Sequence, residues 1–200
     1  MSRTPSTALN RRQVITAGLG AAGIAAVGAT PALAHSYGTQ PLKGKKVLVA
    51  IGDFSEGMET YYMVYRLIEE GVKPTIAAGE VKRVQTVVHD FEPEYSNYTE
   101  KLGYFIDSEI ANHDLDPADF EALLIPGGRG PYEIRHYKAA LELTRYFIDN
   151  KRPLGAMCHG PQLIYAARSM QGRRMAAYHG IRADVETAGA TFVDEPVVID

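Results

Sequence analysis

Four short apolar runs, separated by amphipathic segments, constrain the fold more than any other feature of the chain. They are KKVLVAI (45–51), KPTIAAG (73–79), FEALLIPGG (120–128) and RPLGAMC (152–158). A continuous apolar run of this length is typical of a parallel strand buried on both faces. Because strands that alternate with helices form right-handed crossovers, we expect an α/β doubly wound sandwich with a mostly parallel central sheet in a single domain.

The segments between these runs carry helix signals. After the first run, Ser55 can cap a helix, Glu56 suits the positive helix start, and Gly71 ends the helical pattern. Inside it, apolar residues recur at helical spacing, namely Met58, Tyr61, Tyr65 and Ile68. Further helices are expected from about Pro131 to Asn150, over 159–170 and near 182–188.

Two parts of the chain are less regular. RVQTVVHDF reads as a strand pair or an extended segment, and the polar, tyrosine-rich stretch 90–112 is long for a connection within a compact domain. We interpret 90–112 as a lid, an insertion or an interface, with a variable surface loop as the alternative. Near the end, RRMAAY (173–178) and TFVDEPVVID (191–200) complete the alternation. Asp200 lies inside an apolar run that looks like a strand, so either the protein ends early or the sequence is a fragment.

The first 34 residues are predicted to be an export signal. Arg11 and Arg12 form a twin-arginine pair, a mildly apolar Gly/Ala-rich run follows from Val14 to Ala29, and ALA at 32–34 offers a cleavage site. The alternative is a membrane anchor, which the short run disfavours. The mature domain, 35–200, would be exported by the twin-arginine route to the periplasm or the exterior.

Removal of this signal changes the charge of the chain. It takes three of the 21 basic residues and none of the 24 acidic ones, which changes the net charge from −3 to −6. A mildly acidic protein of mixed charge is not expected to bind nucleic acid. No membrane association is expected after signal removal.

Cys158 is the only cysteine in the chain and cannot form an internal disulfide. It is predicted to lie at the joint between a strand and a helix, where a sharp turn lifts a nucleophile out of the sheet edge. Gly155 and Gly160 would relieve crowding there, and the helix start would favour the thiolate. The alternative is a small, buried structural cysteine.

Glycines and a histidine near this joint are candidates for stabilising an oxyanion. The amides of Gly127, Gly128 and His159 could point at the reacting oxygen, although the glycine pair alone is also typical of a tight turn. The ring of His159 could act as acid or base at the pocket rim. Because neighbours on a helix do not share a face, that ring need not face Cys158, and it could instead bind solvent.

Two glutamates at the start of the first helix are candidates for proton transfer. Glu56 and Glu59 are three residues apart and therefore lie near one face of the helix, and one could reach Cys158. A carboxyl group in contact with a thiolate must be protonated or it repels the thiolate. The alternative is a solvated helix face. No cofactor is expected, and no metal site, because the other histidines, His35, His89, His113, His136 and His179, lack ligand spacing and HDLD (113–116) reads as a loop.

Three motifs together resemble the ThiJ/PfpI superfamily of class I glutamine-amidotransferase-like proteins, which includes the parkinsonism-associated cysteine protein. They are LLIPGGRGP, GAMCHGPQLI and, more weakly, SEGMET, and the similarity runs from about Lys45 to Asp200. The resemblance implies a flavodoxin-like sandwich that forms dimers or larger oligomers. It implies that Cys158 is the reactive residue with Glu59 as its acidic partner, and that Gly128 and His159 supply oxyanion amides.

The chain also departs from the family pattern. In the protease-like branch a glutamate follows the GGRxP motif directly, whereas here Tyr132 holds that place and Glu133 comes one later. One residue turns a side chain by about 100° around a helix, which counts against a peptidase triad. The stretch 90–112 is longer than in compact members, and the final strand and helix of the family are absent.

These features favour an enzyme. We expect a cysteine-dependent hydrolase or lyase with Cys158 as the nucleophile. The resemblance implies that it acts on reactive aldehydes such as methylglyoxal, glycated adducts or amide-like bonds. The partners would be a small molecule or a protein adduct, and a second copy of the chain. Three alternatives stay open: a thiol redox sensor or protective chaperone, a cysteine peptidase, and an exported binding protein with a vestigial site.

Overall fold

The computed structural model describes residues 40–200, which form one compact unit around a five-stranded parallel sheet of order β5-β2-β1-β6-β7. Its strands are β1 (Val47–Ala50), β2 (Thr75–Ala78), β5 (Ile110–Ala111), β6 (Ala122–Ile125) and β7 (Leu154–Ala156). The four predicted apolar runs therefore supply β1, β2, β6 and β7, and the prediction of a mostly parallel central sheet is confirmed.

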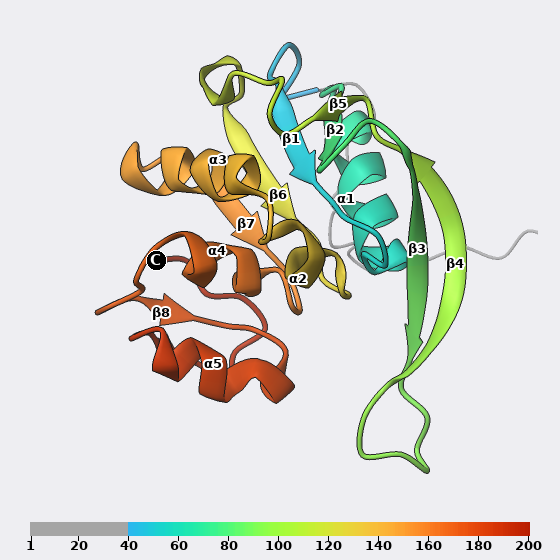
Figure 1. The fold of residues 1–200 in the computed structure, drawn as a ribbon, viewed down its shortest axis with the longest axis vertical. Coiled ribbons are helices and arrows are strands. Elements are labelled where there is room, and N and C mark those ends of the chain that lie inside the picture. Colours follow the sequence, from blue (N-terminus) through green and yellow to red (C-terminus); the bar gives the residue numbers. More distant parts are fainter. Residues whose placement is uncertain (1–39) are drawn as a thin grey trace, which may run out of the picture. The chain divides into compact units, whose positions relative to one another are not determined.

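Helices cover both faces of the sheet, as a doubly wound fold requires (Figure 1). Helix α1 (Gly57–Glu69) lies on one face, and α3 (Lys138–Asp149) and α4 (Pro161–Ala167) lie on the other. The alternation of β1 explains the two layers: Leu48 and Ala50 pack with α3 and α4, while Val49 and Ile51 pack with α1. Each of these strand residues is almost fully buried. Burial of a leucine, isoleucine or valine side chain contributes about 1.5–3 kcal/mol.

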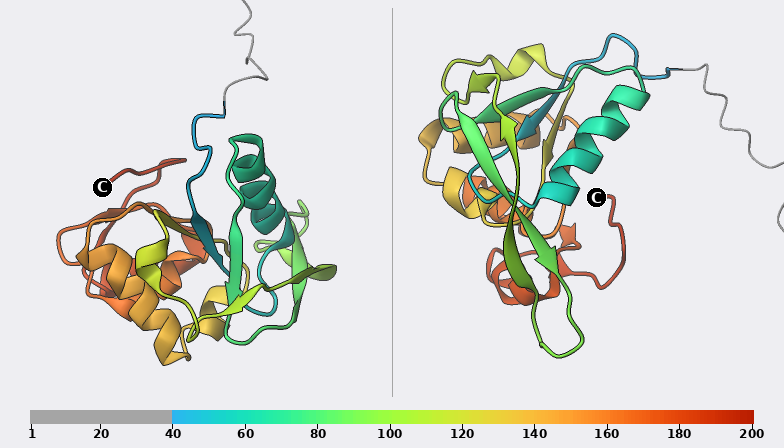
Figure 2. Two further views of the ribbon diagram at one scale, coloured as in Figure 1. Left: turned by 90° about the horizontal axis from the view of Figure 1, so that it is seen from above. Right: turned by 90° about the vertical axis from the view of Figure 1, so that its right-hand side faces the viewer.

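The irregular region forms a hairpin rather than a loop. Strands β3 (Arg83–Asp90) and β4 (Thr99–Asp107) pair in antiparallel fashion and extend away from the central sheet (Figure 2). Val84 and Ile106, near the hairpin base, are buried in the α1 layer of the core. The stretch 90–112 thus supplies the hairpin turn, β4 and the edge strand β5, so it is a structured hairpin and not the surface loop of the alternative interpretation.

Helix α1 differs from the expectation in its cap and its buried face. Its N-cap is Glu56, whose carboxylate accepts a hydrogen bond from the backbone of Glu59, whereas the hydroxyl of Ser55 bonds to Gly52. The buried side chains are Thr60, Met63 and Val64. The predicted apolar stripe faces outward instead, since Met58, Tyr65 and Ile68 are exposed. Helical spacing shows that apolar residues share one face of a helix, but it does not show whether that face is buried or exposed.

The predicted helix from Pro131 to Asn150 is two helices, α2 (Gly130–Ile134) and α3, with Tyr137 in extended backbone between them. No glycine or proline in 135–137 marks this break, so the sequence could not show it.

The last elements lie outside the central sheet. Strands β8 (Arg174–Met175) and β9 (Thr191–Phe192) form their own parallel pair, with α5 (Arg182–Thr187) between them in the chain. The expectation that the run ending at Asp200 is a strand is wrong, because only Thr191–Phe192 is extended and paired, while Val197 and Ile199 are exposed.

The predicted export signal, residues 1–34, lies outside the described residues. Within 40–200, no helix is both long enough and apolar enough to cross a lipid bilayer.

Candidate active site

Cys158 lies at the carboxyl edge of the central sheet, between the end of β7 and the start of α4. Its backbone has a φ of +54°, in the left-handed region that L-residues other than asparagine and aspartate rarely adopt. A conformation of this kind costs about 1–3 kcal/mol and persists where the surrounding structure imposes it. The geometry is that of the predicted strand-to-helix elbow.

Gly127 brings Glu59 against the cysteine. Its amide donates a 2.6 Å hydrogen bond to Oε2 of Glu59. A Cβ on Gly127 would lie 2.5 Å from the Cβ of Cys158 and 2.8 Å from Oε2 of Glu59, so only glycine fits between the two side chains. The three residues come from the loop after β6, from α1 and from the β7–α4 joint, and no sequence spacing relates them.

Two amides face the sulfur. The backbone N–H groups of Gly128 and His159 donate to the sulfur of Cys158, so two of the three predicted oxyanion donors lie beside the thiol. The predicted role of Gly127 as a third donor does not fit, since its amide is committed to Glu59. Gly128 has a φ of +72°, and a Cβ there would lie 2.4 Å from backbone atoms of Phe54 and Glu56, so a residue with a side chain does not fit.

The charge state of the pair differs from the expectation for a thiolate. Burial is the main cause that raises the pKa of Glu59 to about 7, and the nearby charge of Glu56 adds to it. Burial, followed by the charge of Glu59, raises the pKa of Cys158 to about 12. Helix α4 begins only at Pro161, three residues beyond the sulfur, so its dipole does not offset these effects. The resting form is therefore a thiol beside a carboxyl group that can exchange a proton near neutral pH.

The ring of His159 faces the sulfur after all. Its Nδ1 lies 3.2 Å from Sγ of Cys158. The argument that helix neighbours point apart does not apply, because both residues precede α4 and Cys158 is in the left-handed conformation. Burial, together with the nearby His89, lowers the pKa of His159, which keeps the imidazole neutral and able to accept a proton.

Glu56 is buried but serves the site indirectly. Its Oε2 accepts the amide of Glu59 at 2.7 Å, and its Oε1 lies 3.5 Å from the amide nitrogen of His89. No hydrogen bond joins it to Cys158 among the described contacts. We therefore interpret Glu56 as a positioning residue that fixes the start of α1 and raises the pKa of Glu59 through its charge.

A cavity of about 290 Å³ opens next to Gly128 and His159, whose backbone amides face the sulfur of Cys158. It is lined by Tyr98, Gly128, Arg129, Tyr132, His159 and Gln162. The sequence analysis did not assign Tyr98, Arg129 or Gln162 to the site. Arg129 and Gln162 stand within the motifs LLIPGGRGP and GAMCHGPQLI, so their nearness to the motif glycines and to Cys158 was a usable signal. Tyr98 lies in the hairpin, and no spacing predicts that it reaches the cysteine.

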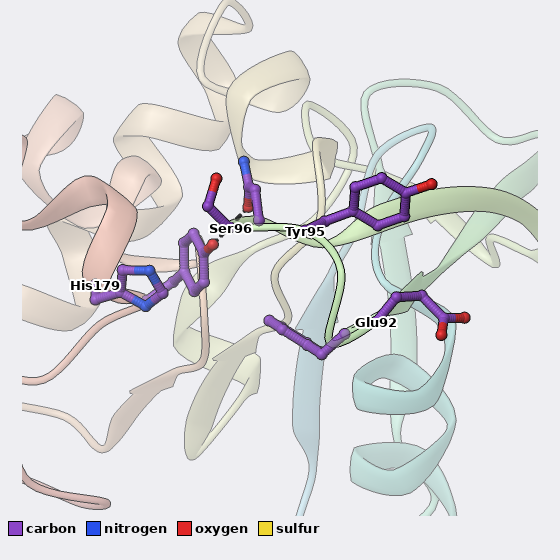
Figure 3. Close-up of a pocket in the computed structure, with 7 residues that line it drawn as sticks. Glu92, Tyr95, Ser96 and His179 are labelled. Atoms are coloured by element: carbon purple, nitrogen blue, oxygen red, sulfur yellow. Dashed lines mark hydrogen bonds between the residues drawn. The ribbon is translucent and has the colours of Figure 1, made fainter.

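The hairpin turn reaches across to the segment after α4. The hydroxyl of Tyr178 donates a 2.6 Å hydrogen bond to Oδ1 of Asn97. The amide of Tyr178 in turn donates to the carbonyl of Cys158 at 3.0 Å. Figure 3 shows the turn, with Tyr95 and Ser96, beside His179 around a small pocket of about 90 Å³. Three distant parts of the chain thus meet at the cysteine.

The departure at the GGRxP motif has a structural counterpart. Tyr132 is exposed and lines the cavity, where the protease-like branch would carry a glutamate. Glu133 turns away from the cysteine and bonds to Tyr137, near Asp53 and Lys82. The shift by one residue therefore removes this carboxylate from the pocket.

The histidines of residues 40–200 do not assemble a metal site, and nowhere in this range do three His, Cys, Asp or Glu side chains gather around one point. His89 pairs with Glu100 and His113 with Asp114. His136 packs on Tyr132 and His179 on Tyr178, while His35 lies outside the described residues.

The fold and the site define a doubly wound α/β protein with a strained cysteine at the sheet edge, held between a carboxyl group and two backbone amides. The chain belongs to the DJ-1/PfpI family, whose model matches residues 45–200. This confirms the resemblance inferred from the three motifs.

Relatives and solved structures agree with this assignment. A protein of Pyrococcus furiosus named as a deglycase is 34% identical over 155 residues, which is 78% of this chain and 85% of that protein. A deglycase of Thermococcus kodakarensis is 32% identical over the same shares of the two chains. The crystal structure of a ThiJ/PfpI domain protein from Brachyspira murdochii matches with a TM-score of 0.66 at 16% identity, covering 78% of this chain and 83% of that one.

Proposed function

We propose that the protein is a cysteine-dependent enzyme of the deglycase type, which acts on carbonyl adducts through Cys158. The observation that carries the proposal is the placement of the thiol between Glu59, Gly128 and His159. A proton acceptor on one side and two amide donors on the other are what addition of a thiol to a carbonyl group requires. Relatives named as deglycases support the same class of reaction.

The first step follows from the geometry. The Cys158 sulfur forms a bond to the carbonyl carbon of the adduct, and the electron pair of the C=O bond moves to the oxygen. The amides of Gly128 and His159 stabilise that oxyanion. The thiol proton passes to Glu59, whose pKa of about 7 makes it a proton acceptor at neutral pH, with His159 as the second acceptor. No oxidant or reductant is consumed in this step.

Substitution of the cysteine tests the proposal. Cys158→Ala is expected to abolish turnover of methylglyoxal and of methylglyoxal-treated N-acetylarginine, while the melting temperature stays within a few degrees of the wild type. Glu133→Gln is the matched control, because its carboxyl group faces away from the cysteine and is expected to leave turnover unchanged. Equal activity in Cys158→Ala and wild type would remove the basis of the proposal.

The two main alternatives are less well supported. A redox sensor would use the same thiol, and the raised pKa of Cys158 slows its oxidation as it slows nucleophilic attack, so this shift does not favour the sensor over the enzyme. A peptidase triad needs a carboxylate in the pocket at the place that Tyr132 occupies. Mild peroxide treatment followed by mass spectrometry separates the first alternative from the proposal, since sulfinic acid at Cys158 before any loss of fold would favour the sensor.

We further propose that the protein assembles with a second copy of itself. The outward stripe of α1 and the exposed residues of β4 form adjoining apolar surfaces, joined by a 2.6 Å hydrogen bond from the Tyr61 hydroxyl to the carbonyl of Phe105. Their exposed members are Met58, Tyr62, Tyr65, Ile68, Leu102, Tyr104 and Phe105. Exposed apolar patches of this extent are typical of interfaces. Light scattering of wild type and Tyr65→Asp tests this, and a wild-type monomer would contradict it.

We also propose that residues 1–34 direct export and that 35–200 is the mature domain, an assignment supported only by the arginine pair and the apolar run. Replacement of Arg11 and Arg12 by lysine is expected to retain the protein in the cytoplasm with its signal uncleaved, as measured by cell fractionation and N-terminal sequencing. Export of the double variant at the wild-type level would contradict the twin-arginine route.

A further inference from the structure

The cavity beside Cys158 has one wall that the central sheet does not supply. Tyr98, in the turn of the β3–β4 hairpin, lines the cavity together with residues of the loops after β6 and β7. It is half-buried, and it lies about 60 residues from the cysteine in the sequence. The β3–β4 hairpin therefore contributes this side chain to the pocket.

The Tyr98 ring is held in a fixed orientation by a buried partner. It stacks on the imidazole of His89 with ring centroids 3.9 Å apart and an interplanar angle of 18°. The His89 side chain is only 3% exposed, and its Nε2 lies 3.1 Å from Oε2 of Glu100. Arg129 clamps the same carboxylate at 2.6 and 3.2 Å. Arg129 also lines the cavity, so the same residue supports the Tyr98 ring through Glu100 and His89 and forms part of the pocket wall.

Neighbouring rings fix the edges of Tyr98. Tyr178 meets it at 5.5 Å and Phe91 at 6.0 Å, both edge-on, and the ring of His159 meets it at 6.0 Å with an interplanar angle of 87°. An aromatic side chain that is already immobilised loses little conformational entropy when a ligand packs on it. The hydroxyl of Tyr98 has no hydrogen-bond partner among the described residues. The contacts that hold this side chain are therefore made by its ring and not by its hydroxyl group.

We propose that Tyr98 determines specificity in the Cys158 pocket, by presenting its ring as a wall on which a planar group of the substrate stacks. The argument rests on the face-to-face support by His89, the edge contacts of three further rings and the position of Tyr98 on the cavity. The hydroxyl group is not required for this role.

The proposal deepens the proposed function and rests on it where it names a substrate class. A cavity of about 290 Å³ is at the lower end of the roughly 300–1,000 Å³ usual for small-molecule sites. It therefore has room beyond a free dicarbonyl for part of the side chain that bears the adduct. Guanidinium groups are planar and stack on aromatic faces, whereas a thioether does not present a plane. We infer that adducts of arginine are preferred over adducts of cysteine.

Alkylation of Cys158 tests the wall without any need for turnover. Because Cys158 is the only cysteine, every alkylated molecule reports on this pocket. The probes are iodoacetamide and its planar N-phenyl analogue, iodoacetanilide. The quantity measured is the ratio of their second-order rate constants, divided by the same ratio for N-acetylcysteine. A ring that stacks on Tyr98 should raise this normalised ratio by about three- to tenfold, the range that an aromatic contact supplies.

Three variants decide the outcome. Tyr98→Ala is expected to lower the normalised ratio to about one, and Tyr98→Phe to keep it. Tyr95→Ala is the matched control, an exposed tyrosine of the same turn outside the cysteine cavity, and is expected to leave the ratio unchanged. An unchanged ratio in Tyr98→Ala, or an equal loss in Tyr98→Phe, would overturn the proposal. Partial unfolding would by itself bring the normalised ratio toward one, so a fall in Tyr98→Ala supports the proposal only where its rate with iodoacetamide stays within about twofold of the wild type. Where that rate rises further, Tyr98→Leu, which keeps a bulky side chain but no ring, decides the outcome in its place.

A second measurement separates this proposal from the proposed function. With methylglyoxal-treated N-acetylarginine and N-acetylcysteine as substrates, Tyr98→Ala is expected to raise KM for the arginine adduct severalfold, with little change in kcat, and to leave the cysteine adduct nearly unaffected. Equal losses on both adducts would contradict the arginine preference. A wild-type protein inactive on both adducts but with the raised alkylation ratio would refute the deglycase proposal and leave the role of Tyr98 intact.

Discussion

The floor and the wall of the cysteine pocket are built in different ways. The floor consists of backbone and glycines from loops that leave the central sheet, namely Gly127, Gly128 and the left-handed turn at Cys158. The wall consists of side chains of the β3–β4 hairpin, Tyr98 above all. The hairpin itself lies outside the central sheet (Figure 2). In the floor an added methyl group meets backbone or reacting atoms, whereas the wall is held by ring contacts and ion pairs.

This difference separates chemistry from selectivity. The floor fixes which atoms meet the sulfur and therefore tolerates almost no change. The wall determines what packs beside the sulfur, and exposed side-chain contacts can change without loss of the fold. The predictions below test whether the two parts respond to substitution independently.

The largest effect is expected in the floor. In Gly127→Ala the new Cβ would overlap Cys158 and Glu59, so we expect a loss of roughly 2–4 kcal/mol in unfolding free energy and at least about a hundredfold loss of turnover. Gly155→Ala is the control, because its Cβ would meet only the flexible end of Leu124. Urea unfolding and steady-state kinetics measure both. Similar behaviour of the two variants would show that the floor is not tightly packed.

A pH-dependent effect is expected from Glu59. Its pKa is raised from 4.5 to about 7 in the folded protein, chiefly by burial, so the folded state holds this proton more tightly than the unfolded state. The stability that this proton provides is complete below pH 4.5 and is lost as the pH rises through 7, a loss of about 3 kcal/mol. Glu59→Gln should abolish this loss of stability at high pH. It should also lower turnover, because the Cys158 thiol then lacks its carboxylate proton acceptor.

Unfolding in urea at pH 4 and pH 9 measures the Glu59 effect as a difference between the variant and the wild type. Glu69→Gln, at an exposed position on the same helix, is the control and should follow the wild type at both pH values. If Glu59→Gln loses as much stability as the wild type between pH 4 and pH 9, the assignment of a raised pKa to Glu59 is contradicted.

A smaller effect is expected when the support of the wall is removed. His89→Ala deletes a buried ring that stacks on Tyr98 and pairs with Glu100, at a cost of about 2 kcal/mol. Hydrogen exchange should show the loss of protection in β3 and β4. The rate of Cys158 alkylation by iodoacetamide, which reports on the floor, should change by less than about twofold. A change of more than tenfold would mean that floor and wall are coupled.

The smallest effect is expected at the hairpin turn. Asn97→Ala removes two exposed hydrogen bonds, from the Tyr178 hydroxyl and from the backbone amide of Tyr98, which together contribute about 1 kcal/mol. Thermal unfolding should detect at most a shift of a few degrees, and Ser96→Ala, beside it in the turn, should show none. A loss above about 2 kcal/mol would show that the turn is as essential to the domain as the floor.

Much of the floor was predictable from the chain. The apolar runs located β1, β2, β6 and β7, and the Gly127–Gly128 pair and the Cys158 joint marked the sheet edge. The spacing of Glu56 and Glu59 made both candidates, and the family resemblance singled out Glu59. The thiolate prediction failed because it considered the helix start and not burial or the charge of Glu59. The wall was not predictable, because Tyr98 reaches the pocket through the length and direction of an insertion with no periodic signal.

The sequence by itself determined the class of fold, the elbow cysteine and the family, since buried parallel strands and the motifs around Cys158 are local patterns of residue type. Only the tertiary structure decided which amides face the sulfur, that the His159 ring reaches it, that the α1 stripe faces outward and that the hairpin supplies a wall. The physical reason is that these depend on contacts between segments far apart in the chain, where burial and the direction of each side chain come from packing and not from local preference.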